Sequence, residues 1–150
     1  MDRGTRVLTA ALLGPLLLAG CFPAPPPPAP ITIALVNLTA LDVRPNLYVS
    51  NSATTGGELF VDANLVTDFT DRAFPELRPN ENATVTRECD EVHSLGVDGP
   101  VLFDVARPGV TRSQDQIFLR RDADFTCGAT IRFVFFTEGE AFRIRVEYPQ

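Results

Sequence analysis

Apolar and polar side chains alternate with a period of two along most of residues 31–150. In the first such segment, Ile31, Ile33 and Leu35 alternate with smaller or polar residues, and similar segments begin near residues 47, 85, 101, 117, 131 and 142. This spacing is typical of strands with one buried face, and no long segment has the 3.6-residue period of a helix. We therefore predict an all-β domain over residues 31–150. The expected architecture is an antiparallel two-sheet sandwich, immunoglobulin-like, of about seven to eight strands.

One segment of this domain fits two structures. Residues 55–58 read Thr-Gly-Gly-Glu, a capping box, and are followed by apolar residues that share a helical face. Residues 59–65 also alternate as a strand would. Because tandem glycines weaken a helix start, we expect a strand or a short turn of helix followed by a loop. Residues 67–82 are expected to form the longest loop, where binding residues often lie on a sandwich.

The first twenty residues have the layout of a secretory signal peptide. Arg3 and Arg6 form a basic start, and residues 7–18 are a twelve-residue apolar run. A transmembrane helix needs about 20 apolar residues, so this run is too short to span a bilayer. A removable leader is therefore expected at residues 1–20.

The leader ends in Leu18-Ala19-Gly20-Cys21. This tetrapeptide resembles the lipobox of bacterial lipoproteins. The resemblance covers residues 1–21 only, and it implies that the Cys21 thiol takes up diacylglycerol and that the chain is cut before Cys21. Residue 22 is Phe rather than the aspartate that retains many such proteins in the inner membrane, which favours the outer membrane. The alternative is an ordinary thiol at Cys21 behind an uncleaved apolar tail.

A proline-rich linker separates Cys21 from the domain. Residues 22–30 contain six prolines, each of which fixes φ and lacks an amide donor, so a polyproline II rod is expected. Nine residues at about 3.1 Å each reach about 28 Å. The predicted organisation is a leader at 1–20, the lipidated cysteine and linker at 21–30, and the sandwich at 31–150. The leader holds two of the 13 arginines and one of the 19 acidic residues, so the mature chain has a net charge of −7.

The two remaining cysteines, Cys89 and Cys127, lie at the ends of predicted strands. Export brings the domain to a compartment where disulfides persist, so we expect these two residues to be bonded. The alternative is a metal site that uses Cys89, His93 and Cys127, although the cysteines lack the close spacing of zinc modules.

No set of catalytic residues is apparent in the sequence. His93 is the single histidine, and no nucleophile elbow, zinc-binding HExxH, P-loop or dinucleotide fingerprint occurs. Acidic pairs at Asp68/Asp71, Asp90/Glu91 and Asp122/Asp124 match no calcium loop, so solvated turns are the simpler interpretation. We expect no enzyme activity and no cofactor. The net charge of −6 also argues against a nucleic-acid partner.

The last two predicted strands form a hairpin across Glu138-Gly139. With a two-residue turn at this place, two residues lie opposite each other when their numbers sum to 277. Phe135 then lies opposite Phe142, and Arg132 lies opposite Arg145. Opposed like charges are destabilising unless something neutralises them. A neighbouring carboxylate such as Glu147 is the simple explanation. The alternative is an anion-binding patch formed by Arg132, Arg143 and Arg145, for lipid phosphate or a glycan carboxylate.

Two classes of function remain. One is a membrane-anchored envelope module that binds a protein or a glycan without catalysis. The other is a small extracytoplasmic enzyme or metal-binding accessory subunit with its site near His93 and the acidic loops.

Overall fold

The computed structural model describes residues 24–69, 76–104 and 109–149. Its strands are β1 (Ile31–Asn37), β2 (Asp42–Arg44), β3 (Leu47–Ser50), β4 (Asn82–Arg87), β5 (Ser94–Asp98), β6 (Val101–Asp104), β7 (Gly109–Arg112), β8 (Gln116–Arg120), β9 (Thr130–Glu138) and β10 (Ala141–Glu147). One four-residue helix, α1 (Gly56–Leu59), and two 3-10 turns (Asp62–Asn64 and Cys89–Glu91) complete the described elements.

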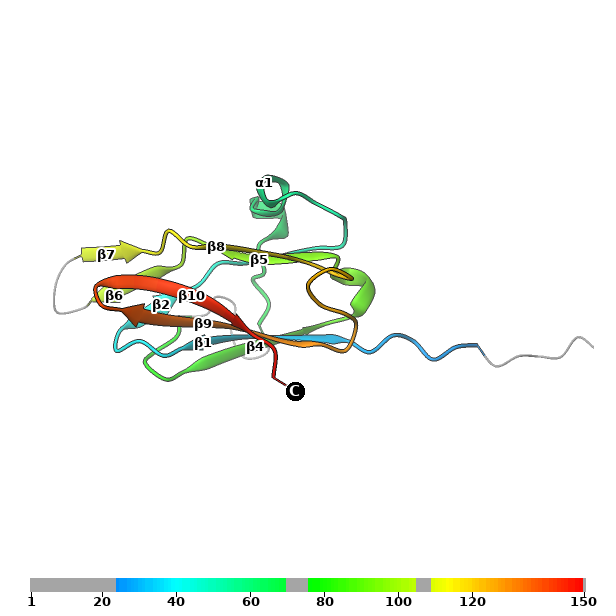
Figure 1. Ribbon diagram of the computed structural model, residues 1–150, viewed down its shortest axis with the longest axis horizontal. Coiled ribbons are helices and arrows are strands. Elements are labelled where there is room, and N and C mark those ends of the chain that lie inside the picture. Colours follow the sequence, from blue (N-terminus) through cyan, green and yellow to red (C-terminus); the bar gives the residue numbers. More distant parts are fainter. Residues whose placement is uncertain (1–23, 70–75, 105–108, 150) are drawn as a thin grey trace, which may run out of the picture.

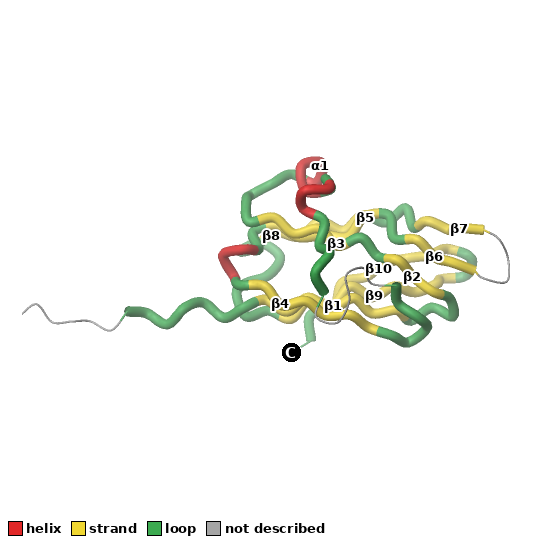
Figure 2. The backbone as a smooth tube through the Cα atoms, turned by 180° about the vertical axis from the view of Figure 1, so that it is seen from behind, coloured by secondary structure: helices red, strands yellow, loops and turns green. Residues whose placement is uncertain are grey.

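The strands form two layers that face each other across the core (Figure 1). One layer is a four-stranded sheet in the order β10-β9-β1-β4. The other layer contains two three-stranded sheets, β2-β6-β7 and β3-β5-β8, which lie end to end (Figure 2). Side chains from both layers interdigitate in one apolar cluster that includes Ile33, Phe133 and Leu95. The predicted all-β sandwich is confirmed.

Two details differ from the sequence-based prediction. The structure has ten strands because each of the three chain passes in the second layer is divided into two strands. Pro45 lies between β2 and β3, and Pro100 lies between β5 and β6. Residues 113–115 lie between β7 and β8. Proline cannot donate a ladder hydrogen bond, so a strand breaks where one occurs. Counted as passes of the chain, these ten strands reduce to seven. The second difference is that β1 pairs with β9 in parallel, so the sandwich is not wholly antiparallel.

β1 is the central strand of the four-stranded sheet. It pairs with β4 on one side and with β9 on the other, and its inward side chains Ile31, Ile33 and Leu35 have no exposed surface. Residues 24–30 lead into this strand as exposed backbone with no helix or strand. The linker therefore enters directly into the core of the domain, at the end where β8 connects to β9 (Figure 1).

The ambiguous segment after β3 is a short helix followed by a loop. The capping box forms, since the backbone N–H of Thr55 donates to the Glu58 carboxylate at 2.8 Å. This hydrogen bond lowers the pKa of Glu58 below its ordinary value. The next residue, Phe60, packs edge-on against Tyr48 at a centroid distance of 5.3 Å. Its ring also lies over Gly96 of β5. A Cβ atom at this position would clash with the backbone carbonyl oxygen of Ile117 and would lie 3.1 Å from the Phe60 ring, so glycine allows both contacts.

Asn37 ends β1 with a buried side-chain amide. Its Nδ2 lies 2.8 Å from the carbonyl oxygens of Leu41 and Leu77 and 3.0 Å from that of Arg78. Its Oδ1 accepts the backbone N–H of Thr39 at 2.8 Å. Asn37 has no exposed surface, so these partners replace all the water that its amide would otherwise bind. One side chain thereby fixes the β1–β2 turn and the segment that precedes β4.

Replacing Asn37 by aspartate tests this arrangement. Asn37→Asp keeps the shape but removes both amide donors and places a carboxylate against three carbonyl oxygens. We expect it to lower the free energy of unfolding by about 3–5 kcal/mol, measured by urea denaturation. Asn51→Asp, at an exposed asparagine, is the matched control and should change stability by less than about 0.5 kcal/mol. Equal effects of the two substitutions would contradict the role given to Asn37.

Candidate binding surface

The three arginines of the predicted patch lie on the outer face of the four-stranded sheet. Arg132 comes from β9, whereas Arg143 and Arg145 come from β10. All three point away from the core because they alternate with inward residues such as Phe133 and Ile144. Their side chains are 38–47% exposed. The structure therefore brings the predicted patch residues together on one accessible face.

The register of the β9–β10 hairpin differs from the prediction. Glu138 pairs with Ala141, which places the turn at Gly139-Glu140 and makes the numbers of paired residues sum to 279. Gly139 has a φ of 61°, which suits the first central position of a type II′ turn, where glycine is preferred. The predicted turn at Glu138-Gly139 is therefore wrong by one residue. Each side chain still lies on the face of the hairpin that was predicted for it. The pairing has moved by two residues, and residues two apart on a strand share a face.

The corrected register removes the expected opposition of like charges. Arg132 lies opposite Glu147 rather than opposite Arg145. The Glu147 carboxylate is 3.2 Å from Arg132 and 2.9 Å from Arg145, so it bridges the two arginines. Glu147, the neighbouring carboxylate that the simple explanation named, thus contacts both arginines. Arg143 is likewise 2.9 Å from Asp115 and 4.0 Å from Glu138.

Apolar side chains form the floor beneath these charges. Val134 of β9 and Val36 of β1 lie side by side on the outer face and are nevertheless buried. The guanidinium of Arg145 is 4.9 Å from the centroid of the Phe136 ring, a cation–π distance. Long arginine side chains can cover apolar residues in this way while their charged ends remain in water. We define the arginine face as Arg132, Val134, Phe136, Arg143, Arg145 and Glu147.

One border of the arginine face is closed by side chains from the β7–β8 connection. The hydroxyl of Ser113 donates to the carbonyl oxygen of Phe142 at 3.0 Å. Asp115 accepts the backbone N–H of Ile144 at 2.9 Å and also binds Arg143. These contacts occupy backbone groups on the outer edge of β10, where another strand could otherwise pair. They also place Arg143 over an open hollow of about 640 Å³, which is lined by Gln114, Asp115, Gln116, Ile117, Phe136, Glu138, Arg143 and Ile144.

The alternative site near His93 is not assembled as a metal centre. Cys89 and Cys127 form the predicted disulfide, so their sulfur atoms are not available as thiolate ligands for a metal. Within the described residues, no three histidine, cysteine or acidic side chains lie close enough to hold a metal ion. Asp71 lies outside the described residues. The Nδ1 atom of His93 is buried and has no hydrogen-bond partner in the described part of the chain.

The acidic residues of the loops bind nearby backbone N–H groups and arginine side chains. Asp124 accepts the backbone N–H of Arg120 at 2.7 Å, and Asp122 lies 3.7 Å from Arg121. Asp68 forms an ion pair with Arg87 beside an open hollow of about 400 Å³. Glu91 accepts the backbone N–H of Glu88 at 3.2 Å. These contacts are those of turn residues, which agrees with the simpler of the two interpretations.

Sequence reasoning missed three residues whose side chains hold the backbone in place, at the end of β1 and at the edge of β10. Asn37 has a recognisable signal, because Asn-x-Thr is a pattern in which the asparagine oxygen accepts a backbone N–H two residues later. Ser113 and Asp115 have no such signal, since their partners in β10 lie 29 residues away in the sequence. Cys21 and its lipobox lie outside the described residues.

No protein-family model matches the chain, and none of the curated proteins matches it. Among solved structures, the chain is similar to the T6SS lipoprotein TssJ1 from Pseudomonas aeruginosa, with 19% identity and a TM-score of 0.46 over 83% of this chain and 99% of that one. It is also similar to the membrane-binding domain of pneumolysin, with 11% identity and a TM-score of 0.48 over 79% of this chain and 96% of that one. At these identities and TM-scores, the likeness carries no information on function.

The bridging position of Glu147 leads to a prediction about stability. Replacing Arg132 and Arg145 together by alanine removes two exposed ion pairs that share one carboxylate. Because exposed pairs contribute little, we expect the free energy of unfolding to change by less than about 1 kcal/mol, as measured by urea denaturation. A loss of several kcal/mol would show instead that the two arginines are needed for folding.

Proposed function

We propose that this chain is a lipid-anchored lipoprotein of the bacterial cell envelope, whose domain stands off the membrane and binds a partner without catalysis. The observation that carries the anchor is Leu18-Ala19-Gly20-Cys21 behind a twelve-residue apolar run and ahead of the proline linker. Acyl chains on Cys21 gain about 0.8 kcal/mol for each buried methylene, so two or three of them hold a protein on a bilayer. Phe22 favours the outer membrane.

The described residues support a membrane-attached, extracytoplasmic domain in two ways. The chain from residue 24 to residue 30 is exposed and leads into β1, so the domain can extend away from an anchored Cys21. The Cys89–Cys127 disulfide suits an oxidising compartment. No helix in the described part of the chain is long and apolar enough to cross a membrane.

The arginine face is the surface that we propose for binding. It combines an apolar floor with three guanidinium groups that are accessible to a ligand. A guanidinium can exchange one carboxylate partner for another, or for a phosphate, with the same paired geometry. An anionic group of an envelope polymer would therefore displace Glu147 or Asp115 from the arginines. This assignment favours a binding module over an enzyme or a metal-binding subunit.

Replacing Cys21 tests the anchor. Cys21→Ala removes the thiol that accepts the lipid, so we expect unprocessed precursor and complete loss of fatty-acid labelling. Phe22→Ala is the matched control: it changes the adjacent residue but keeps the Cys21 thiol, so labelling should stay intact. Labelling of the Cys21→Ala variant at the level of the parent would rule out the anchor.

Removing charge from the arginine face tests the binding surface. The double variant Arg132→Ala with Arg145→Ala should lose at least about tenfold in affinity for an anionic ligand, because each arginine–anion contact is charge-assisted. The probes are a polyuronic acid, which presents carboxylates, and vesicles of phosphatidylglycerol, which present phosphate. Arg78→Ala with Arg120→Ala removes the same charge from two exposed residues elsewhere and is the matched control. Equal binding by both double variants would exclude the arginine face as the site.

A further inference from the structure

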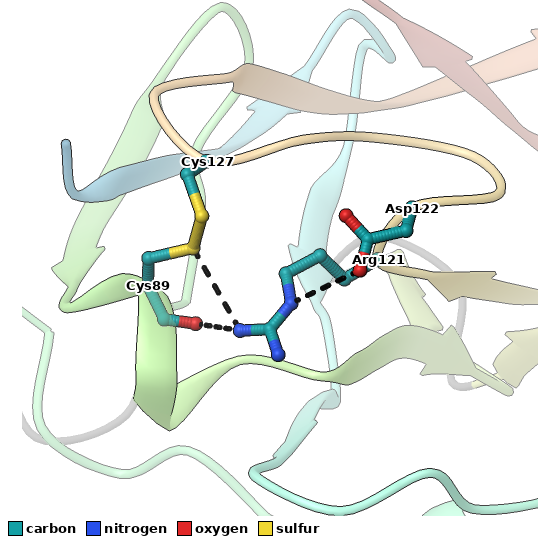
Figure 3. Close-up of a disulfide and its surroundings, with 4 residues drawn as sticks. All are labelled: Cys89, Arg121, Asp122 and Cys127. Atoms are coloured by element: carbon teal, nitrogen blue, oxygen red, sulfur yellow. Dashed lines mark hydrogen bonds and ion pairs between the residues drawn. A yellow bond between two sulfur atoms is a disulfide. The ribbon is translucent and has the colours of Figure 1, made fainter. Parts of the chain in front are cut away.

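The two ends of the disulfide lie in different environments. Cys89 begins the 3-10 turn after β4 and is only 2% exposed, whereas Cys127 lies on the β8–β9 connection and is exposed. Their Cα atoms are 5.4 Å apart (Figure 3). An attacking thiolate must approach the sulfur atom that it bonds to, so access favours attack at Cys127.

A positive charge lies beside the buried sulfur, Cys89 Sγ. The guanidinium of Arg121 donates to the backbone carbonyl of Cys89 and lies 3.7 Å from Cys89 Sγ (Figure 3). Asp122, 3.7 Å from the same side chain, holds it from the solvent side. The Arg121 side chain is 22% exposed, so its field at the sulfur is only partly screened by water. A negative charge that develops on Cys89 Sγ is therefore stabilised where it forms.

We propose that an incoming thiolate attacks this disulfide at one particular sulfur atom, Cys127 Sγ, and that Cys89 is the thiolate that leaves. A thiolate of a dithiol oxidoreductase bonds to Cys127 Sγ, the Cys89–Cys127 bond breaks, and its electron pair passes to Cys89 Sγ beside Arg121. The second thiol of the oxidoreductase, once deprotonated, then attacks the mixed disulfide and releases Cys127. Two electrons reduce the protein disulfide, and the dithiol becomes a disulfide. In oxidative folding the same steps run backwards, with Cys89 as the resolving thiolate.

The position of Cys127 determines where such an enzyme approaches. The neighbouring Gly128 donates its backbone N–H to the carbonyl oxygen of Ala29 in the linker at 3.0 Å. Exchange therefore takes place at the end of the domain where the linker enters, rather than on the arginine face. It does not depend on the lipid anchor, so the two proposals can fail separately.

Mapping the mixed disulfide tests the direction. The full chain is purified in detergent, its free thiols are blocked with N-ethylmaleimide, and it is then exposed briefly to reduced glutathione. A second addition of N-ethylmaleimide traps the released thiolate, and peptide masses locate the adducts. We expect glutathione on Cys127 at least about tenfold more often than on Cys89, with N-ethylmaleimide on Cys89. Equal distribution, or glutathione mainly on Cys89, would overturn the proposal.

Removing the charge at residue 121 tests the leaving group. Arg121→Gln should slow reduction of the disulfide by glutathione about three- to tenfold, because the departing Cys89 thiolate loses its cation. Arg120→Gln, at an exposed neighbour on β8, is the matched control and should react at the parent rate. Arg121→Lys keeps the charge and should restore most of the rate, which separates an electrostatic effect from a folding defect. An Arg121→Gln protein that is reduced as fast as the parent would refute the role of Arg121.

Discussion

The central strand β1 must be held at both ends, and the rest of the sandwich depends on how this is done. At its start, the linker residue Ala29 accepts the backbone N–H of Gly128, and the adjacent Cys127 is tied to Cys89. At its end, Asn37 uses its buried amide to fix two turns. Between these points, β1 supplies hydrogen bonds to β4 and β9 and three fully buried side chains to the core. A strand with neighbours on both sides cannot shift register without exposing those side chains.

This arrangement provides the two regions for which we propose functions. The disulfide lies at the end of the domain where the linker enters, because Gly128, next to Cys127, donates its backbone N–H to the linker residue Ala29. The arginine face runs along the outer side of β9 and β10. The Ser113 and Asp115 contacts secure the outer edge of β10, which keeps the arginines in place. We propose ligand binding on this face of the sheet and thiol exchange at the β8–β9 connection, which carries Cys127.

Much of the fold could be predicted because the alternation of side chains reports directly on which face of a strand is buried. The inward positions of β1, β9 and β10 and the seven passes of the chain were predictable in this way. The parallel pairing of β1 with β9 was not, because periodicity carries no information on strand direction. The hairpin turn was misplaced by one residue, since the turn type that Gly139 adopts depends on its φ. Arg132 lies opposite Glu147 because of that register.

The sequence by itself determined the all-β class and the shared outward face of Arg132, Arg143 and Arg145, and it predicts the leader, the lipobox and the linker. These are local properties, set by composition and by periods of a few residues. Tertiary structure alone decided that Glu147 bridges Arg132 and Arg145, that Asp115 binds Arg143, and that Arg121 lies beside Cys89. Such contacts need side chains that lie within a few ångströms of each other. Packing of the whole core determines which segments of the chain come that close.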